Sequence, residues 1–225
     1  MKPKTFYGLP QKVLFCKKSL MSNQRPNSVI EFLHNKHSKK KTLELDKNGV
    51  SETWKYSRLK KKINYQQREK QLLKLLDKHR GKHGEFDCIV PGGGGKDSCY
   101  ASHILKYKYG MNPLTITWAP HMYTPWGWEN MELWSKSGFD NSLFSPNRKV
   151  QKLLTRLAVE NLFHPFQPFM FGQKFLAPRI AMLHNIELIF YGEHQAEYGN
   201  AISETKNSEM DRKYFISELN EEKMS

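Results

Sequence analysis

The stretch that decides the fold is Phe86-Asp87-Cys88-Ile89-Val90-Pro91-Gly92-Gly93-Gly94-Gly95-Lys96-Asp97-Ser98. Its apolar run Cys88–Val90 predicts a β-strand, the glycines Gly92–Gly95 predict a loop, and Ala101, Ile104 and Leu105 follow with helical spacing. Glycines let a backbone approach an anion closely, and the free N–H groups at a helix start point toward that anion. Strand, glycine loop and helix together predict a phosphate-binding cradle.

Two common phosphate-binding loops do not fit this stretch. The Walker A pattern needs glycine where Val90 stands and Ser or Thr where Asp97 stands. The dinucleotide fingerprint would need its last glycine at Asp97 or Ser98. A flexible glycine linker is a further alternative, and the strand and helix signals on both sides argue against it.

The loop resembles the pyrophosphate loop Ser-Gly-Gly-x-Asp-Ser of the N-type ATP pyrophosphatases, or PP-loop enzymes. Gly94, Gly95, Asp97 and Ser98 match that pattern, and Gly93 replaces its leading Ser. Enzymes of this class cleave ATP between the α and β phosphates and transfer AMP to a carbonyl oxygen. The resemblance therefore implies ATP as the ligand of the cradle, with Mg²⁺ as its counterion.

Strand and helix signals alternate along the rest of the chain. Strands are predicted at 114–118, 142–144 and 187–191, and helices at 65–80, 128–137, 149–161 and 172–184, with Pro178 as a break in the last. This alternation predicts an α/β fold with a doubly wound parallel sheet, like that of the adenine nucleotide alpha hydrolases. Ligands of such sheets bind at the carboxyl ends of the strands.

The charge of the 225-residue chain is unevenly distributed. The net charge is +14, and residues 1–84 hold 22 Lys or Arg against 6 Asp or Glu, whereas residues 85–225 hold 14 against 16. We therefore expect a basic N-terminal segment at 1–84 and a PP-loop domain at 85–225. The basic segment suits nucleic acid, an acidic partner or a nucleotide-linked substrate, and a solvated lysine-rich surface is the alternative.

Cysteine usage and hydropathy bear on the compartment. Cys16, Cys88 and Cys99 form no close pair, which excludes a disulfide framework and suits a reducing compartment. The sequence has no apolar run of transmembrane length and no secretory signal pattern. We expect a cytoplasmic protein with no membrane partner.

Two carboxylates follow the last predicted strand. Glu193 stands directly after Gly192 at the strand end, and Glu197 lies one helical turn later. Mg²⁺ prefers oxygen ligands, so Asp97, Glu193 and Glu197 are candidate magnesium ligands beside the phosphates of ATP. The alternative is that Glu193 and Glu197 only stabilise a helix N-terminus.

Aromatic residues follow the strand at 114–118. Trp118, Tyr123, Trp126 and Trp128 lie within eleven residues, and Trp118 is a candidate wall for an adenine or sugar ring. Hydrophobic packing under a loop explains the same pattern. His121 is a candidate acid or base, although a lone histidine is more often structural.

The stretch from Phe86 to about Asn200 resembles the N-acetyl sugar amidotransferases, which modify bacterial surface (LPS) and flagellin sugars. The matching pieces are 91–98, 114–123, 139–147, 153–173 and 191–200. The resemblance implies that the acetamido oxygen of a free or nucleotide-linked N-acetyl sugar is adenylated. Ammonia from separate glutaminase and synthase-like partner proteins then displaces AMP and leaves an acetamidino group.

The resemblance also implies roles for individual residues. The amides of Gly92–Gly95 and the Ser98 hydroxyl would hold the departing pyrophosphate. Asp97 would fix the loop or the metal, and Lys96 would counter the developing negative charge. Preorganised donors of this kind typically contribute a few kcal/mol each to transition-state stabilisation.

The chain departs from the family in two respects. Where the family has two Cys-x-x-Cys pairs of a zinc ribbon, this chain reads Cys16-Lys17-Lys18-Ser19 and Ser51-Glu52-Thr53-Trp54. One cysteine of four cannot hold a structural zinc, so we expect a degenerate ribbon without metal. The chain also stops at Ser225, where family members continue, so the PP-loop domain is expected to be truncated.

Two other functions remain open from the sequence. A PP-loop tRNA-modifying ligase would explain the basic segment, whereas a thiolase is disfavoured because Cys88 and Cys99 form no Cys-x-x-Cys pair. An inactive nucleotide-binding subunit would explain the lost zinc ligands and the short C-terminus.

Overall fold

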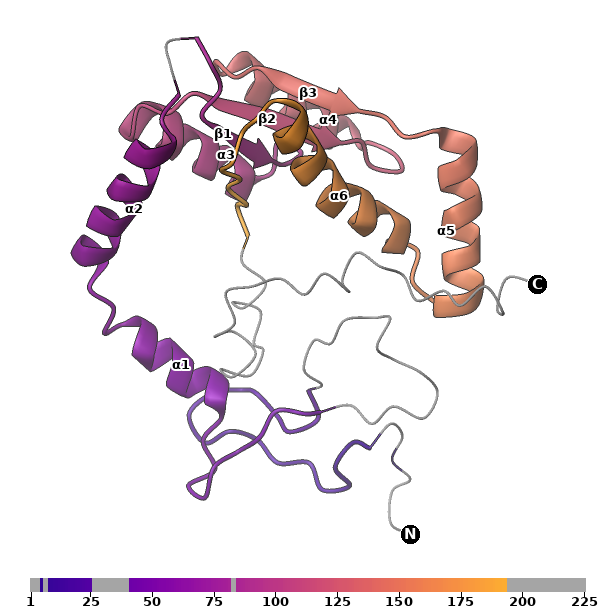
Figure 1. The fold of residues 1–225 in the computed structure, drawn as a ribbon. Helices are drawn as coiled ribbons and strands as arrows, with labels where there is room; N and C mark the ends of the chain where they lie inside the picture. The colour runs from indigo at the N-terminus through magenta and orange to yellow at the C-terminus, as the bar shows by residue number, and fades with distance from the viewer. Residues whose placement is uncertain (1–4, 6–7, 26–40, 82–83, 194–225) are drawn as a thin grey trace. The chain divides into compact units, whose positions relative to one another are not determined.

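The structure is a computed structural model that describes residues 5, 8–25, 41–81 and 84–193 (Figure 1). The described residues separate into two units, one formed by residues up to Asn64 and the other by Tyr65–Glu193. The second unit contains the glycine loop and a three-stranded sheet. No helix among the described residues is both long enough and apolar enough to cross a membrane.

The sheet consists of β1 (Cys88–Pro91), β2 (Pro113–Trp118) and β3 (Asn141–Phe144), in that order and all parallel. Parallel neighbours need a crossover connection. The first crossover contains α3 (Lys96–His103), which continues into the π-helix η2 (Ile104–Lys108), and the second contains α4 (Pro125–Lys136). The strands therefore end at one edge of the sheet, where the glycine loop leaves β1.

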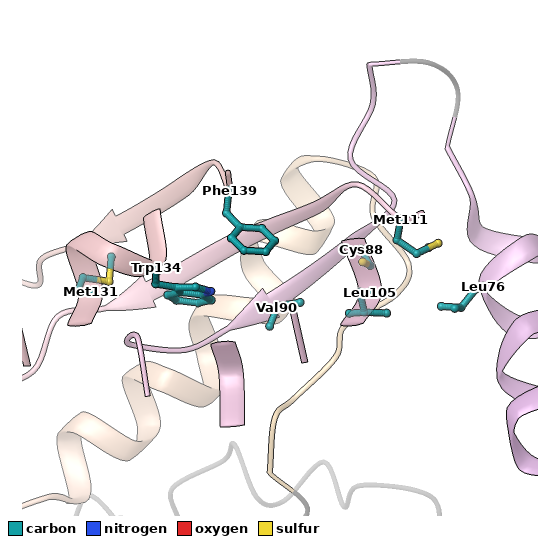
Figure 2. Packing of buried hydrophobic residues seen from close by; sticks show 8 residues of the cluster. All are labelled: Leu76, Cys88, Val90, Leu105, Met111, Met131, Trp134 and Phe139. Atoms are coloured by element: carbon teal, nitrogen blue, oxygen red, sulfur yellow. The ribbon is translucent and has the colours of Figure 1, made fainter. Parts of the chain in front are cut away.

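Helices cover both faces of the sheet. Successive side chains of β1 point to opposite faces and therefore pack against different helices. Cys88 and Val90 belong to one buried cluster, together with residues from α3–η2, α4 and α2 (Tyr65–His79). Figure 2 shows the buried side chains of this cluster: Leu76, Cys88, Val90, Leu105, Met111, Met131, Trp134 and Phe139. Ile89 faces the other way and packs, with Leu114 and Ile116, against α6 (Gln167–Leu183). This arrangement confirms an α/β fold with a parallel sheet between helices.

Helix α6 runs without interruption through Pro178, where the sequence predicted a break. Its buried residues Ala177 and Ala181 lie on either side of Pro178 and pack on the sheet. Packing of this face holds the helix together although proline cannot donate a backbone hydrogen bond. Helix α5 (Arg148–Leu162) precedes it and matches the predicted helix closely.

The predicted fourth strand, 187–191, is reduced to a single parallel bridge between Ile89 and Ile189. The amide of Ile89 donates to the carbonyl of Leu188 (2.9 Å), and the amide of Phe190 donates to the carbonyl of Ile89 (2.8 Å). The segment thus lies along the side of β1 that β2 does not occupy. A complete doubly wound sheet stays a prediction.

The described residues of the first unit form short antiparallel bridges and one helix. Phe15 pairs with Ser22, and Leu45 pairs with Ser51. Ser51 then caps α1 (Glu52–Lys60) by accepting a hydrogen bond from the amide of Trp54. The sequence pattern did not predict α1, because none of its side chains is buried and no apolar stripe marks it.

Candidate nucleotide-binding site

The glycine loop connects the end of β1 to the first turn of α3. The amide of Gly92 donates to the carbonyl of Ile116 (2.9 Å), which anchors the start of the loop to β2. Gly95 is the N-cap of α3, and no side chain caps the helix there. The first N–H groups of a helix lack intrahelical partners and carry the positive end of its dipole. This end of α3 can therefore receive an anion.

The glycines of the loop divide into two kinds. Gly94 adopts φ +80°, and a Cβ atom built on it would lie 2.7 Å from the amide nitrogen of Met131 in α4. Gly92 faces inward as well, against Ser98 and Trp134. Gly93 and Gly95 are different, because a Cβ built on either meets no atom within 4 Å. The loop is thus packed on one side and open on the other.

The predicted catalytic residues Lys96, Asp97 and Ser98 form the first turn of α3. The Ser98 side chain is buried, and its hydroxyl donates to the carbonyl of Gly95 (3.1 Å). Lys96 Nζ lies 2.8 Å from Asp97 Oδ1, with side chains 88% and 40% exposed. An ion pair this exposed contributes little stability.

The structure brings Gly192 onto the same turn. A Cβ atom built on Gly192 would lie 2.6 Å from the carbonyl carbon of Asp97 and 2.8 Å from the amide nitrogen of Ser98. Glu193 is the next residue and is exposed. Mg²⁺ usually keeps several waters and takes only one or two carboxylates, so Asp97 and Glu193 stay candidate ligands. Glu197 lies outside the described residues, within which no cluster of three His, Cys, Asp or Glu occurs.

Trp118 lies at the end of β2 and faces α6. Its ring stacks on Phe144 with centroids 5.0 Å apart and planes at 24°. A Cβ atom added to Gly172 of α6 would collide with the Trp118 indole, so the two are in close contact. The glycine loop instead packs against α4, on the opposite face of the sheet. Trp118 as an adenine wall stays a prediction.

Two residues of the loop after β2, Pro120 and His121, contact α5. His121 Nε2 lies 2.8 Å from the Thr155 hydroxyl. Arg148 Nη1 donates to the carbonyl of Pro120 (2.7 Å) and contacts the Gln151 amide oxygen at 3.4 Å. Sequence reasoning did not single out Arg148, Gln151 or Thr155. The sequence held a weak indication of these residues, because the polar residues at 148, 151 and 155 share one face of the predicted helix.

In the first unit, two of the positions that correspond to the zinc ligands meet. Cys16 Sγ accepts hydrogen bonds from the amides of Lys18 (3.4 Å) and Ser51 (3.3 Å). Burial raises the pKa of the Cys16 thiol, but hydrogen bonds from the Ser19 and Ser51 side chains and from these amides outweigh burial and lower the pKa to about 6. The lowered pKa favours the thiolate form of Cys16 beside the Ser19 and Ser51 hydroxyl groups.

Comparisons with known proteins give limited matches. No protein-family model matches the chain. An uncharacterized protein of Methanocaldococcus jannaschii is 34% identical over 58 residues, which are 26% of this chain and 21% of that protein. The chain therefore spans about a fifth of the length of this curated relative. A crystal structure of a predicted subunit of a tRNA methyltransferase from the same organism matches with 21% identity and a TM-score of 0.35, over 49% of this chain and 54% of that one. Neither similarity establishes a family or a function, and neither supports the sugar amidotransferases specifically.

Proposed function

We propose that the chain is an ATP-dependent enzyme of the PP-loop type, which forms AMP and pyrophosphate. The observation that supports this most directly is the uncapped start of α3, with Gly93 and Gly95 open beside it. The contact of Gly192 with Asp97 and Ser98 brings the end of the segment that bridges to Ile89 to the same place. Crevices at the carboxyl ends of parallel strands are the usual ligand sites of α/β sheets.

The proposed roles follow from the positions of the residues. The loop amides and the first amides of α3 bind the phosphates, and Ser98 holds the carbonyl of Gly95 and thereby the end of the loop. Lys96 offsets the charge of the departing pyrophosphate, and Asp97 and Glu193 bind Mg²⁺. Bound ATP supplies the AMP group that turns an unreactive amide oxygen into a leaving group.

For the acceptor, we propose the acetamido group of an N-acetyl sugar, with ammonia replacing AMP to give an acetamidino group. The support is the sequence resemblance, which includes 114–123 and 153–173 around the end of β2. The ammonia would come from glutaminase and synthase-like partner proteins, in surface polysaccharide or flagellin glycan synthesis.

A tRNA-modifying ligase is the second candidate, and one observation favours it. The described residues of the first unit are strongly basic, with Lys60, Lys61 and Lys62 ending α1 and following it. Lysines that neutralise phosphates give affinity for RNA without base recognition. A nucleotide-binding subunit without activity is the third possibility.

ATP–pyrophosphate exchange distinguishes these functions. The purified full chain is incubated with ATP, Mg²⁺ and labelled pyrophosphate, and either a panel of acetamido sugars or bulk tRNA is added. Exchange that depends on a sugar supports the amidotransferase, and exchange that depends on tRNA supports the ligase. ADP and phosphate as products would overturn the PP-loop assignment, and ATP binding without exchange would indicate the inactive subunit.

A further inference from the structure

Buried polar atoms without a hydrogen-bond partner lie on elements that contact one another: the end of β2, the loop after it, and helices α5 and α6. They are Trp118 Nε1, Tyr123 Oη, Gln151 Nε2 and Gln167 Oε1, and none of them hydrogen-bonds to any described residue. Gln151 is 6% exposed and Gln167 is 8% exposed. Buried polar groups are nearly always paired in folded proteins, so each of these atoms calls for a partner.

His121 connects the elements that carry these atoms. Its Nε2 lies 2.8 Å from the Thr155 hydroxyl, which in turn donates to the carbonyl of Gln151 (2.8 Å). The ring of His121 also lies 6.3 Å from that of Phe166, the residue before Gln167. The ring of Phe166 is 60% exposed, so the cluster extends to the protein surface.

The two glutamines offer opposite hydrogen-bonding groups. Arg148 Nη1 contacts the Gln151 amide oxygen, and this contact leaves the Gln151 NH₂ group as an unused donor. Gln167 presents an unused carbonyl acceptor. A secondary amide needs one donor for its C=O and one acceptor for its N–H, so the pair complements an acetamido group.

The surrounding side chains suit the rest of a sugar. The indole N–H of Trp118 is a donor, and the Tyr123 hydroxyl can donate or accept. The Trp118 ring already stacks on Phe144, so Trp118 contributes its indole N–H, and the Tyr123 ring offers apolar surface next to its polar tip. Small-molecule sites typically combine such an apolar lining with a few polar groups that fix orientation.

We propose that Trp118, Tyr123, Gln151 and Gln167, which lie on elements in contact with one another, form the acceptor subsite and bind the acetamido group and ring of an N-acetyl sugar. The choice of ligand rests on the proposed function. The subsite itself rests on the four unpartnered atoms, which neither the glycine loop nor the sequence resemblance explains.

The test is sugar binding by the full chain and by two variants, Gln151→Met and Gln167→Met. Methionine keeps the size of glutamine but removes its amide, and Gln71→Met makes the same change at an exposed position of α2. The probes are N-acetylglucosamine, its UDP-linked form, N-acetylgalactosamine, and glucosamine as the ligand that lacks the acetyl group. Affinities are measured by calorimetry and by saturation-transfer NMR, and ATP binding and thermal unfolding are measured alongside.

We expect at least one acetamido sugar to bind and glucosamine to bind far more weakly. Gln151→Met or Gln167→Met should lower sugar affinity at least about tenfold, as the loss of one well-made hydrogen bond does. Gln71→Met should not change it. Gln167→Met should unfold at the same or a higher temperature, because an unpartnered buried polar atom is removed, and this readout separates lost binding from misfolding. Gln151→Met also loses the contact with Arg148, so its unfolding temperature should fall only slightly. Tighter binding of the UDP-linked form would identify a nucleotide-linked substrate.

Two outcomes overturn the subsite. One is that no acetamido sugar binds, and the other is that sugar affinity is unchanged in both variants, which would mean that ordinary water pairs these atoms. The proposed function fails differently: sugar would bind and depend on the glutamines, but it would not stimulate ATP–pyrophosphate exchange. Sugar-dependent exchange that is insensitive to both substitutions would keep the function and reject the subsite.

Discussion

The backbone of Asp97 leaves no room for a side chain on Gly192, where an added Cβ would lie 2.6 Å from the Asp97 carbonyl carbon. The two residues belong to segments that lie far apart in the sequence, the start of α3 and the segment that bridges to Ile89. Their contact holds the end of that segment against the helix start. It also places Glu193 beside the turn that contains Asp97 and Ser98.

The contact predicts that Gly192→Ala disturbs both stability and ATP binding. The new methyl group would force a shift in the backbone of Asp97 and Ser98, and overpacking of this kind typically costs about 1–3 kcal/mol. We expect a lower unfolding temperature and weaker ATP affinity, measured by thermal unfolding and by nucleotide titration. Gly81→Ala is the control, because the nearest atom to its Cβ is 3.4 Å away. Unchanged stability in Gly192→Ala would contradict the close contact.

A substitution at Gly93 should separate binding from stability. A Cβ at Gly93 meets no atom within 4 Å, so Gly93→Ala should unfold at the temperature of the unsubstituted protein. The methyl group would enter the space that the phosphates need, and we expect ATP affinity to fall at least about tenfold, or about 1.4 kcal/mol. Gly94→Ala should instead destabilise the fold, because Gly94 has φ +80° and packs on α4. Equal ATP affinity in Gly93→Ala would place the phosphates elsewhere.

Much of the fold could be predicted from the sequence because its signals are local. The β-strand Cys88–Pro91, the glycine loop and the start of α3 follow from an apolar run, four glycines and helical spacing within one short stretch. The helix α1 escaped prediction because it buries none of its side chains and therefore has no periodic apolar pattern. The fourth strand was overpredicted, since its apolar residues 188–190 indicate burial but do not determine how many ladder hydrogen bonds form.

The site was less predictable, because its parts meet only through the tertiary fold. Nothing local to Gly192 indicates a contact with Asp97. The face of the sheet on which Trp118 lies could be predicted, however. The side-chain period of two along β2 places Trp118 on the same face as Leu114 and Ile116, toward α6. Gln167 has no sequence signature and Gln151 only the weak one of a polar helix face, since glutamine is usually exposed.

The first turn of α3 predicts the consequences of Asp97→Ala and Ser98→Ala. Among the described residues, the Asp97 side chain forms an exposed ion pair with Lys96, so its removal should leave the fold intact while weakening magnesium binding. Ser98→Ala removes the hydrogen bond to Gly95 that closes the loop. Each variant should reduce pyrophosphate release by about 10²–10³-fold, as loss of one oriented group at a reacting centre does. Asp77→Ala, at an exposed position of α2, is the matched control for Asp97→Ala, and equal loss in that variant would exclude a specific role.

Metal content tests the prediction that the first unit is a degenerate ribbon without zinc. Ser19 and Ser51 stand at positions where the ribbon pattern has cysteine, and hydroxyl groups are poor zinc ligands compared with thiolates. We expect purified full-length protein to contain no stoichiometric zinc by elemental analysis. One tightly bound zinc per chain would contradict this expectation.

The Cys16 thiol gives the last prediction, which concerns pH. Its pKa is lowered from 9.0 to about 6, so folding favours the thiolate. A group with a lowered pKa stabilises the folded state fully above its unfolded pKa and loses this contribution as the pH falls through its folded pKa. The free energy of unfolding should therefore rise from about pH 6 to about pH 9 by more in the unsubstituted protein than in Cys16→Ser. The difference in ultraviolet thiolate absorbance between the two proteins should titrate near pH 6, because burial raises the pKa values of Cys88 and Cys99 and keeps them out of this range. A midpoint for Cys16 near pH 9 would show that burial outweighs the hydrogen bonds from Ser19 and Ser51.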